Sequence, residues 1–178
     1  MPKKMQEARR GGHGTFDRLV SIEMIEAVGH RYLPVYFGTL SRMLAPTGLA
    51  ALQAIVIPDQ KYETYRRSVD FIQRHVFPGS LLPSLARISE CVRGATDPRV
   101  VAPEDITEHY PPTLAAWRRR LLSETEALDR IGLDARFRRL WDYYFSYCEG
   151  GFLERVIGDV QLVYAKPSHP GGSRRGVA

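Results

Sequence analysis

Hydrophobic residues gather in short apolar runs, which longer stretches of helical periodicity separate. The run 49–57, LAALQAIVI, contains one polar residue, Gln53, and is short enough to predict a buried strand. The run 16–22 is also apolar and predicts a strand that is buried on both faces. Two more strands are expected, one within 99–110 and one over 156–165.

Apolar residues spaced by three and four positions predict helices between these strands. One helix has Pro34 near its start, and the residues 45–48, APTG, are expected to end it and turn the chain. A short helix is expected over 85–92 with Ser84 as its cap. Two longer helices follow, over 113–130, ended by Gly132, and over 134–149, broken by Gly150 and Gly151.

The order of these elements predicts an α/β fold. It corresponds to the C-terminal half of a doubly wound, Rossmann-like domain that lacks the first strands. We expect a partial domain over 15–166 between disordered ends at 1–14 and 167–178. The segment 59–84 is too long for a simple strand-to-helix link and predicts a lid-like insertion.

Composition narrows the function classes. The net charge is +5 and the two cysteines, Cys91 and Cys148, are far apart, so neither a zinc site nor a disulfide framework is expected. No apolar run is long enough to span a bilayer and no signal peptide is recognisable, so we expect a cytoplasmic protein. Arginine clusters within helical patterns fit solvated faces or anionic lipid headgroups better than nucleic acid.

Polar residues at the ends of the predicted elements are the candidates for chemistry. Singly, each is more typical of a structural role, but an open α/β sheet gathers its ligand contacts at such positions. Gln53 is either satisfied by neighbouring backbone or faces a ligand near the end of its strand. These candidates are Glu26, Gln53, His109, Tyr110, Tyr143, Tyr144, Tyr147 and Cys148.

Four segments together carry a resemblance to the cyclopropane-fatty-acyl-phospholipid synthases, which are S-adenosylmethionine-dependent class I methyltransferases. They occur in the order EMIEAVG, DFIQRHVFPG, HYPPTLAAWRRR and YYFSYCEGGF. The resemblance implies methylene transfer from S-adenosylmethionine to the cis double bond of phospholipid acyl chains, with a bound bicarbonate as the base. It also implies peripheral association with the membrane surface, no nucleic-acid partner, and allows a homodimer.

The resemblance further implies roles for individual residues. Glu26 and Tyr110 match the side chains that hold bicarbonate, and backbone near Ile55 and Cys148 completes that pocket. Cys148 matches the position often described as the active-site cysteine, although the mechanism forms no bond to it. Gln53 stands where many relatives carry histidine. Ser21 and Ile22 match a wall of the cofactor pocket, and the aromatic and arginine residues of 62–84 match a cover over the acyl chain.

The sequence differs from the family pattern at the expected cofactor site, and this difference leaves three hypotheses open. The sequence contains neither the glycine-rich cofactor loop that follows the first strand of class I methyltransferases nor the acidic residue after their second strand. The chain is then a synthase whose cofactor half comes from elsewhere and which is inactive alone, or a non-catalytic remnant or interaction module. The third hypothesis is a related methyltransferase without ring closure. Without neighbouring strands, the strand at 16–22 is expected to become an exposed edge.

Overall fold

The computed structural model describes residues 15–170. It divides into two compact units. The first, here called the sheet unit, runs to Glu104 and resumes at Val160, and the second, the helical unit, is Asp105–Asp159. The predicted disorder of 1–14 lies outside the described residues, as does most of the tail predicted to be disordered at 167–178.

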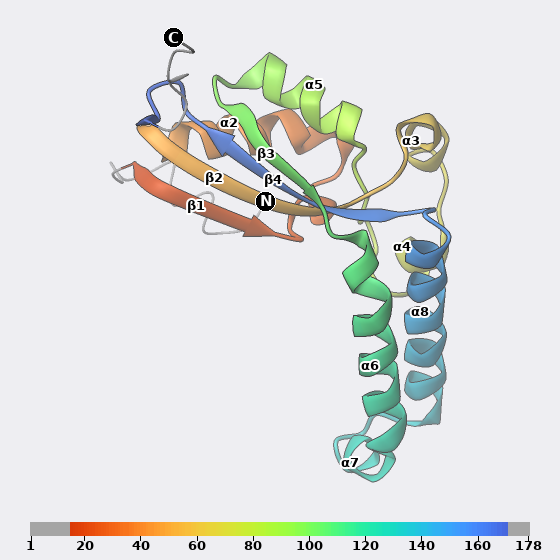
Figure 1. The fold of residues 1–178 in the computed structure, drawn as a ribbon. Coiled ribbons are helices and arrows are strands. Elements are labelled where there is room, and N and C mark those ends of the chain that lie inside the picture. The colour runs from red at the N-terminus through yellow and green to blue at the C-terminus, as the bar shows by residue number, and fades with distance from the viewer. Residues whose placement is uncertain (1–14, 171–178) are drawn as a thin grey trace. The chain divides into compact units, whose positions relative to one another are not determined.

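Four strands form one sheet in the order β1-β2-β4-β3, as Figure 1 shows. All four were predicted, and so was the α/β class. β1 and β2 run parallel, whereas the arrow of β4 points the opposite way (Figure 1). Their bounds are β1 (Phe16–Ile22), β2 (Leu44–Val56), β3 (Arg99–Asp105) and β4 (Gly158–Ala165).

β1 is an exposed edge, and the prediction that it is buried on both faces is wrong. Val20 is 65% exposed and Ile22 is 62% exposed. In the described part of the chain, β1 has β2 as its sheet neighbour on one side and no strand on the other. The expectation of an exposed edge is therefore confirmed. The β-branched side chains of Val20 and Ile22, which are typical of buried strands, face solvent here.

A bulge joins the start of β2 to β1. Phe16 pairs with Leu44 but Arg18 pairs with Leu49, so three additional residues of β2 loop out between the two pairs. The residues 45–48, predicted to turn the chain before the strand, thus lie within β2. A Cβ on Gly48 would lie 3.1 Å from the Phe16 carbonyl oxygen, which explains why glycine fits this close approach.

Helices α2 (Leu33–Met43) and α5 (Leu85–Ala95) pack together on one face of the sheet (Figure 1). Pro34 lies in the first turn of α2, as predicted. The Ser84 hydroxyl accepts a hydrogen bond from the Arg87 N–H at 3.2 Å, which confirms it as the cap of α5. The insertion holds two short helices, α3 (Asp59–Tyr65) and α4 (Phe71–His75).

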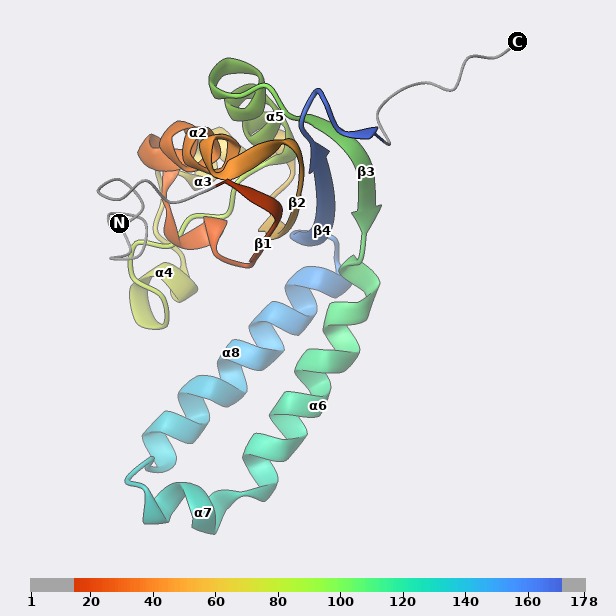
Figure 2. The same ribbon diagram turned by 90° about the vertical axis from the view of Figure 1, so that its left-hand side faces the viewer.

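The helical unit is a hairpin of α6 (Tyr110–Ser123) and α8 (Ala135–Leu153) with the short α7 (Thr125–Arg130) at its turn (Figure 2). The single helix predicted over 113–130 is therefore two helices. α8 continues through Gly150 and Gly151, so the predicted break is wrong. A Cβ on Gly151 would lie 3.3 Å from the Ile157 side chain, so this glycine serves close packing rather than helix termination.

Candidate active site

The carboxyl ends of β1 and β2 place an acidic loop at one edge of the sheet. The loop begins at Glu23, whose φ of 46° is in the left-handed region that few side chains adopt. The Glu23 N–H donates to the Gln53 carbonyl oxygen at 3.0 Å, which continues the β1–β2 ladder for one more residue. The 3-10 helix η1 (Ile25–Ala27) follows and carries Glu26 back toward β2.

Glu26 is a buried carboxyl group, only 9% exposed. Its Oε1 accepts a 2.7 Å hydrogen bond from the Ile55 N–H. Its Oε2 is buried and has no hydrogen-bond partner within residues 15–170. Burial raises the pKa of Glu26, the backbone hydrogen bonds from Glu26 and Ile55 oppose that rise, and the Glu23 charge adds to it. The group is thus held in place at one oxygen while the other has an unmet polar requirement.

Gln53 lies beside this loop near the carboxyl end of β2. Its Nε2 donates to Glu23 Oε1 at 3.0 Å, and its Oε1 accepts from Gln161 Nε2 of β4 at 3.0 Å. These bonds fix which end of the amide is which. The Gln53 amide thus bonds to two side chains, one of which is Glu23, and its contact with a ligand stays a prediction.

Ser21 and Ile22 lie on opposite faces of β1. Ser21 is 7% exposed, and its hydroxyl accepts a 2.7 Å hydrogen bond from the Tyr36 hydroxyl of α2. Burial raises the pKa of Tyr36 to about 12, so this phenol stays protonated and donates. Sequence reasoning missed Tyr36, because nothing in a helical apolar stripe distinguishes a hydrogen-bonded tyrosine from a packed one.

The remaining predicted residues belong to the helical unit. Tyr110 begins α6, and its ring stacks on Phe152 with centroids 4.5 Å apart. Cys148 lies in α8 and is buried, with 6% of its surface exposed. Glu26 and Gln53 belong to the sheet unit, so the joint pocket with Tyr110 and Cys148 stays a prediction.

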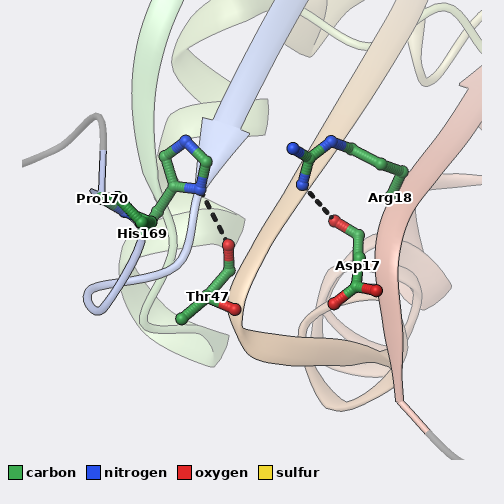
Figure 3. A pocket seen from close by; sticks show the side chains of 5 residues that line it. All are labelled: Asp17, Arg18, Thr47, His169 and Pro170. Carbon is green, nitrogen blue, oxygen red and sulfur yellow. Dashed lines mark hydrogen bonds between the residues drawn. The ribbon is translucent and has the colours of Figure 1, made fainter.

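An open hollow of about 730 Å³ lies at the opposite end of β1 (Figure 3). Asp17 and Arg18, Thr47 of the β2 bulge, His169 and Pro170 line it. The His169 Nδ1 donates to the Thr47 carbonyl at 2.8 Å, and Arg18 donates to the Asp17 carbonyl at 2.8 Å. The His169 and Arg18 side chains thus bond to main chain, and Glu26 is not among the residues that line the hollow.

Residues 15–170 contain neither a candidate metal site nor a candidate membrane-spanning helix. No cluster of histidine, cysteine and acidic side chains in this range could hold a metal ion. Within the same range, no helix combines the length and the apolar character that crossing a bilayer requires.

Comparison with known proteins identifies relatives along most of the chain. Residues 6–162 match the family described as mycolic acid cyclopropane synthetase. The tuberculostearic acid methyltransferase of Mycobacterium tuberculosis is 40% identical over 157 residues, which are 88% of this chain and 37% of that protein. The cyclopropane-fatty-acyl-phospholipid synthase of Escherichia coli is 31% identical over 154 residues, 85% of this chain and 38% of that protein.

Solved structures agree with the fold. The mycolic acid cyclopropane synthase CmaA1, complexed with SAH and CTAB, superimposes with a TM-score of 0.77 at 26% identity, over 86% of this chain and 56% of that one. The cyclopropane synthase MmaA2 of Mycobacterium tuberculosis gives a TM-score of 0.75 at 22% identity over the same shares, which supports the fold alone. The chain thus spans less than two fifths of these two curated relatives and 56% of these two structures.

Proposed function

The chain belongs to the mycolic acid cyclopropane synthetase family, and we propose that it supplies the acceptor side of a site that transfers one carbon from S-adenosylmethionine to a lipid acyl chain. The observation that carries this proposal is the Glu26 carboxyl, buried at the carboxyl end of the sheet with one oxygen held by Ile55 and the other without a partner in the described structure. Such an arrangement holds a small polar group beside an apolar core.

Glu26 fits a bicarbonate ion as the bound group. When bound, bicarbonate would supply a proton acceptor for the reacting carbon. The Oε2 atom needs a hydrogen-bond partner, and the O–H of a bicarbonate ion can donate to it. The hydrogen bond from the Ile55 N–H fixes the orientation of the Glu26 carboxyl group. The roles of Tyr110 and of the main chain at Cys148 toward the same ion stay predictions from the resemblance, and we do not propose Cys148 as a nucleophile.

The cofactor contacts of this chain are limited to the end of β1. S-adenosylmethionine, when bound, would supply an electrophilic methyl group. Ile22 is 62% exposed and offers an apolar surface, whereas the Ser21 hydroxyl is engaged by Tyr36, so Ser21 would contribute main chain only. The 178-residue sequence has no glycine-rich loop, and so we propose that the rest of the cofactor site lies on another segment.

Methylation without ring closure is the second candidate. Gln53 does not decide between the two outcomes, because its amide cannot take up a proton and both outcomes require the carbocation to lose one. The relative that is 40% identical is named as a methyltransferase of tuberculostearic acid rather than as a cyclopropane synthase. A remnant without catalysis is the third candidate, and the experiment below separates it from the other two.

Peripheral contact with a lipid surface is proposed for one face of α8. Arg136, Arg139, Tyr143 and Tyr147 follow each other at spacings of three, four and four residues, so they share that face, and all four are exposed. Arginine and tyrosine place an apolar stem or ring at the boundary of a lipid surface and a polar group in its headgroups. Sedimentation with phosphatidylglycerol vesicles should weaken in an Arg136→Gln/Arg139→Gln variant but not in Arg119→Gln/Arg120→Gln on α6.

A chimera tests the chemistry. Residues 15–170 replace the matching segment of the Escherichia coli synthase, and the fatty acids of the expressing cells are analysed by gas chromatography and mass spectrometry. We expect acyl chains that have gained one CH2 group, and no product when Glu26 is replaced by Gln. Mild hydrogenation adds hydrogen to an unsaturated methylated chain but not to a cyclopropane. A chimera that binds S-adenosylmethionine without forming product would establish the remnant.

A further inference from the structure

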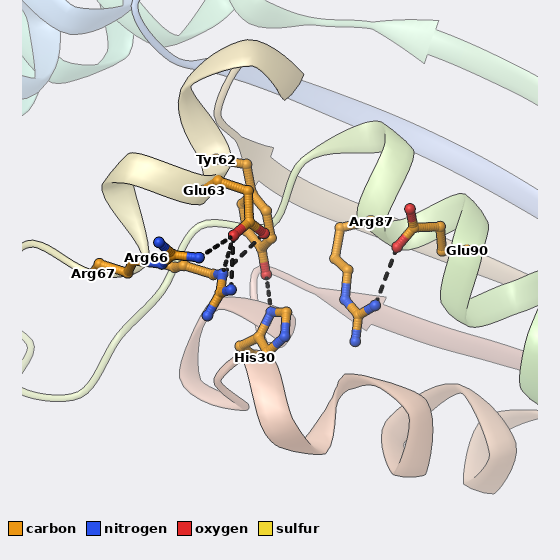
Figure 4. Close-up of polar contacts among 7 residues, drawn as sticks. All are labelled: His30, Tyr62, Glu63, Arg66, Arg67, Arg87 and Glu90. Carbon is orange, nitrogen blue, oxygen red and sulfur yellow. Dashed lines mark hydrogen bonds and ion pairs between the residues drawn. The ribbon is translucent and has the colours of Figure 1, made fainter.

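A cluster of basic and aromatic side chains lies where the insertion meets the two sheet-covering helices (Figure 4). His30 comes from η2 (His30–Tyr32), which precedes α2, and Tyr62 comes from α3. A 2.8 Å hydrogen bond joins His30 Nδ1 to the Tyr62 hydroxyl, and Tyr62 is only 4% exposed. Since Nδ1 is engaged, the other ring nitrogen of His30, Nε2, is the one left for a ligand.

Two arginines approach this pair from different helices. Arg66 follows α3, and its Nε and Nη2 donate to Glu63 at 2.9 and 2.7 Å. Arg87 lies in the first turn of α5, and its Nη1 donates to Glu90 at 3.1 Å. The Nε of Arg87 is buried and has no acceptor in the described structure. A buried guanidinium N–H without an acceptor is costly, so this atom calls for a bound group.

The two arginine side chains are less exposed than the two glutamate side chains that pair with them. The Arg66 and Arg87 side chains are 28% and 22% exposed, whereas those of Glu63 and Glu90 are 60% and 55% exposed. The acids are therefore well solvated, and water weakens their neutralising effect. A positive charge remains on the inner side of the cluster, where His30 and Tyr62 lie.

The pKa shifts of His30 and Tyr62 agree with this charge distribution. Burial lowers the pKa of His30, Arg87 and Arg66 lower it further, and Glu63 and Glu90 oppose them. Burial raises the pKa of Tyr62, Arg87 and Arg66 counteract that rise, and the buried Cys91 thiol and Glu63 add to it. Figure 4 shows the side chains of both arginines near those of His30 and Tyr62, and their effects on the two pKa values agree with this placement.

We propose that His30, Arg66 and Arg87 form a binding site for a phosphate-type oxyanion, as carried by a phospholipid headgroup or by a soluble phosphate ester. The guanidinium groups match the oxygens of a phosphate, and an oxygen at Arg87 Nε would satisfy the buried N–H. All three residues belong to the sheet unit. The site needs neither S-adenosylmethionine nor Glu26, so it stands or fails independently of the proposed reaction.

Nuclear magnetic resonance of the histidine rings tests the site with inorganic phosphate as the probe. The His30 signal is assigned as the one missing from His30→Gln, and phosphate is added at constant ionic strength and pH. We expect a saturable shift of that signal and a higher pKa of His30 with phosphate bound. In Arg87→Gln the affinity for phosphate should fall about tenfold or more, since a hydrogen bond to a charged group contributes about 1.5–3 kcal/mol.

A matched control separates the site from general basicity. Arg93 lies on the same helix and is exposed, so Arg93→Gln should bind phosphate like the unmodified protein. If Arg87→Gln does not fold, Arg66→Gln should weaken binding in its place. The proposal is overturned if the His30 signal does not saturate with phosphate, or if Arg93→Gln loses as much affinity as the Arg66 or Arg87 variants.

The two sources of phosphate are distinguished by vesicles. Binding to phosphatidylglycerol vesicles that weakens in Arg87→Gln, with the Arg136/Arg139 pair intact, assigns the site to a lipid headgroup. Vesicle binding equal in Arg87→Gln and the unmodified protein, combined with saturable binding of inorganic phosphate, assigns it to a soluble phosphate ester. Both results support the oxyanion site.

Discussion

The N–H of Ile55 holds one oxygen of the Glu26 carboxylate at 2.7 Å, and this bond lowers the pKa that burial of the same group raises. Burial has the larger effect, so the folded protein holds the Glu26 proton more tightly than the unfolded chain does. Protein stability that depends on this proton is fully present below about pH 4.5, the ordinary pKa of glutamate. It is lost as the pH rises through the raised pKa of the folded state.

A Glu26→Gln substitution should therefore become relatively more stable as the pH rises. The amide keeps an oxygen for the Ile55 N–H but carries no charge to be buried. Between about pH 4.5 and about pH 8, the difference in free energy of unfolding should move in favour of the variant as the pH rises. Urea unfolding at several pH values measures it. Glu108→Gln on the exposed surface is the control, and a constant difference across the pH range would contradict the assignment of burial as the main cause.

Ser84→Ala should destabilise the protein by about 1 kcal/mol through the loss of one helix cap. The Ser84 hydroxyl accepts from the Arg87 N–H, and the residue is only 2% exposed, so water cannot replace it easily. Thermal unfolding followed by circular dichroism measures the change. Ser80→Ala, which removes a partly buried hydroxyl four residues earlier outside any helix, should change stability less. Equal losses in both variants would show that the cap does not stabilise α5.

Sequence reasoning located the strands because their apolar runs are short and bounded. It located Glu26 because an acidic residue after such a strand lies where open sheets bind ligands. It failed at the predicted helix break, where packing of Gly151 against Ile157 favours glycine inside the helix. Local propensity does not record such a neighbour, which lies beyond the same helix.

The His30–Tyr62 pair was missed for a related reason. The two residues are 32 positions apart, and their hydrogen bond depends on how the insertion folds back onto the sheet unit. The arginines of the insertion were matched to a cover over the acyl chain by resemblance, and Arg87 was not singled out. The burial of the Arg87 Nε can be recognised only when the positions of the neighbouring groups are known. Spatial convergence of distant residues is the part of the site that a single sequence does not carry.

Purified alone, the 178-residue chain should show no binding of S-adenosylmethionine at micromolar affinity. The sequence has no glycine-rich loop to approach the cofactor with its backbone, and the Ser21 hydroxyl is engaged by Tyr36. Isothermal titration calorimetry measures the affinity, with folding checked by circular dichroism in the same buffer. Clear micromolar binding by a folded sample would overturn the proposal that another segment supplies most of the cofactor site.

Self-association through β1 is expected for the chain on its own. β1 presents unpaired backbone groups and exposed apolar side chains, with Phe16 at 48%, Val20 at 65% and Ile22 at 62% exposed. Edges of this kind pair with a second strand unless a charge blocks them. Val20→Lys should therefore lower the fraction of oligomer at a given concentration, as measured by sedimentation velocity.

The control for this prediction is Val69→Lys. Val69 is 73% exposed and lies in the insertion, outside the helices and strands, so the substitution adds the same charge away from the edge. If the added charge alone raised solubility, both variants would reduce association equally. A reduction confined to Val20→Lys would place the contact at β1. Because the substitution adds a positive charge to both β1 strands of such a pair, the effect should weaken as salt screens the repulsion.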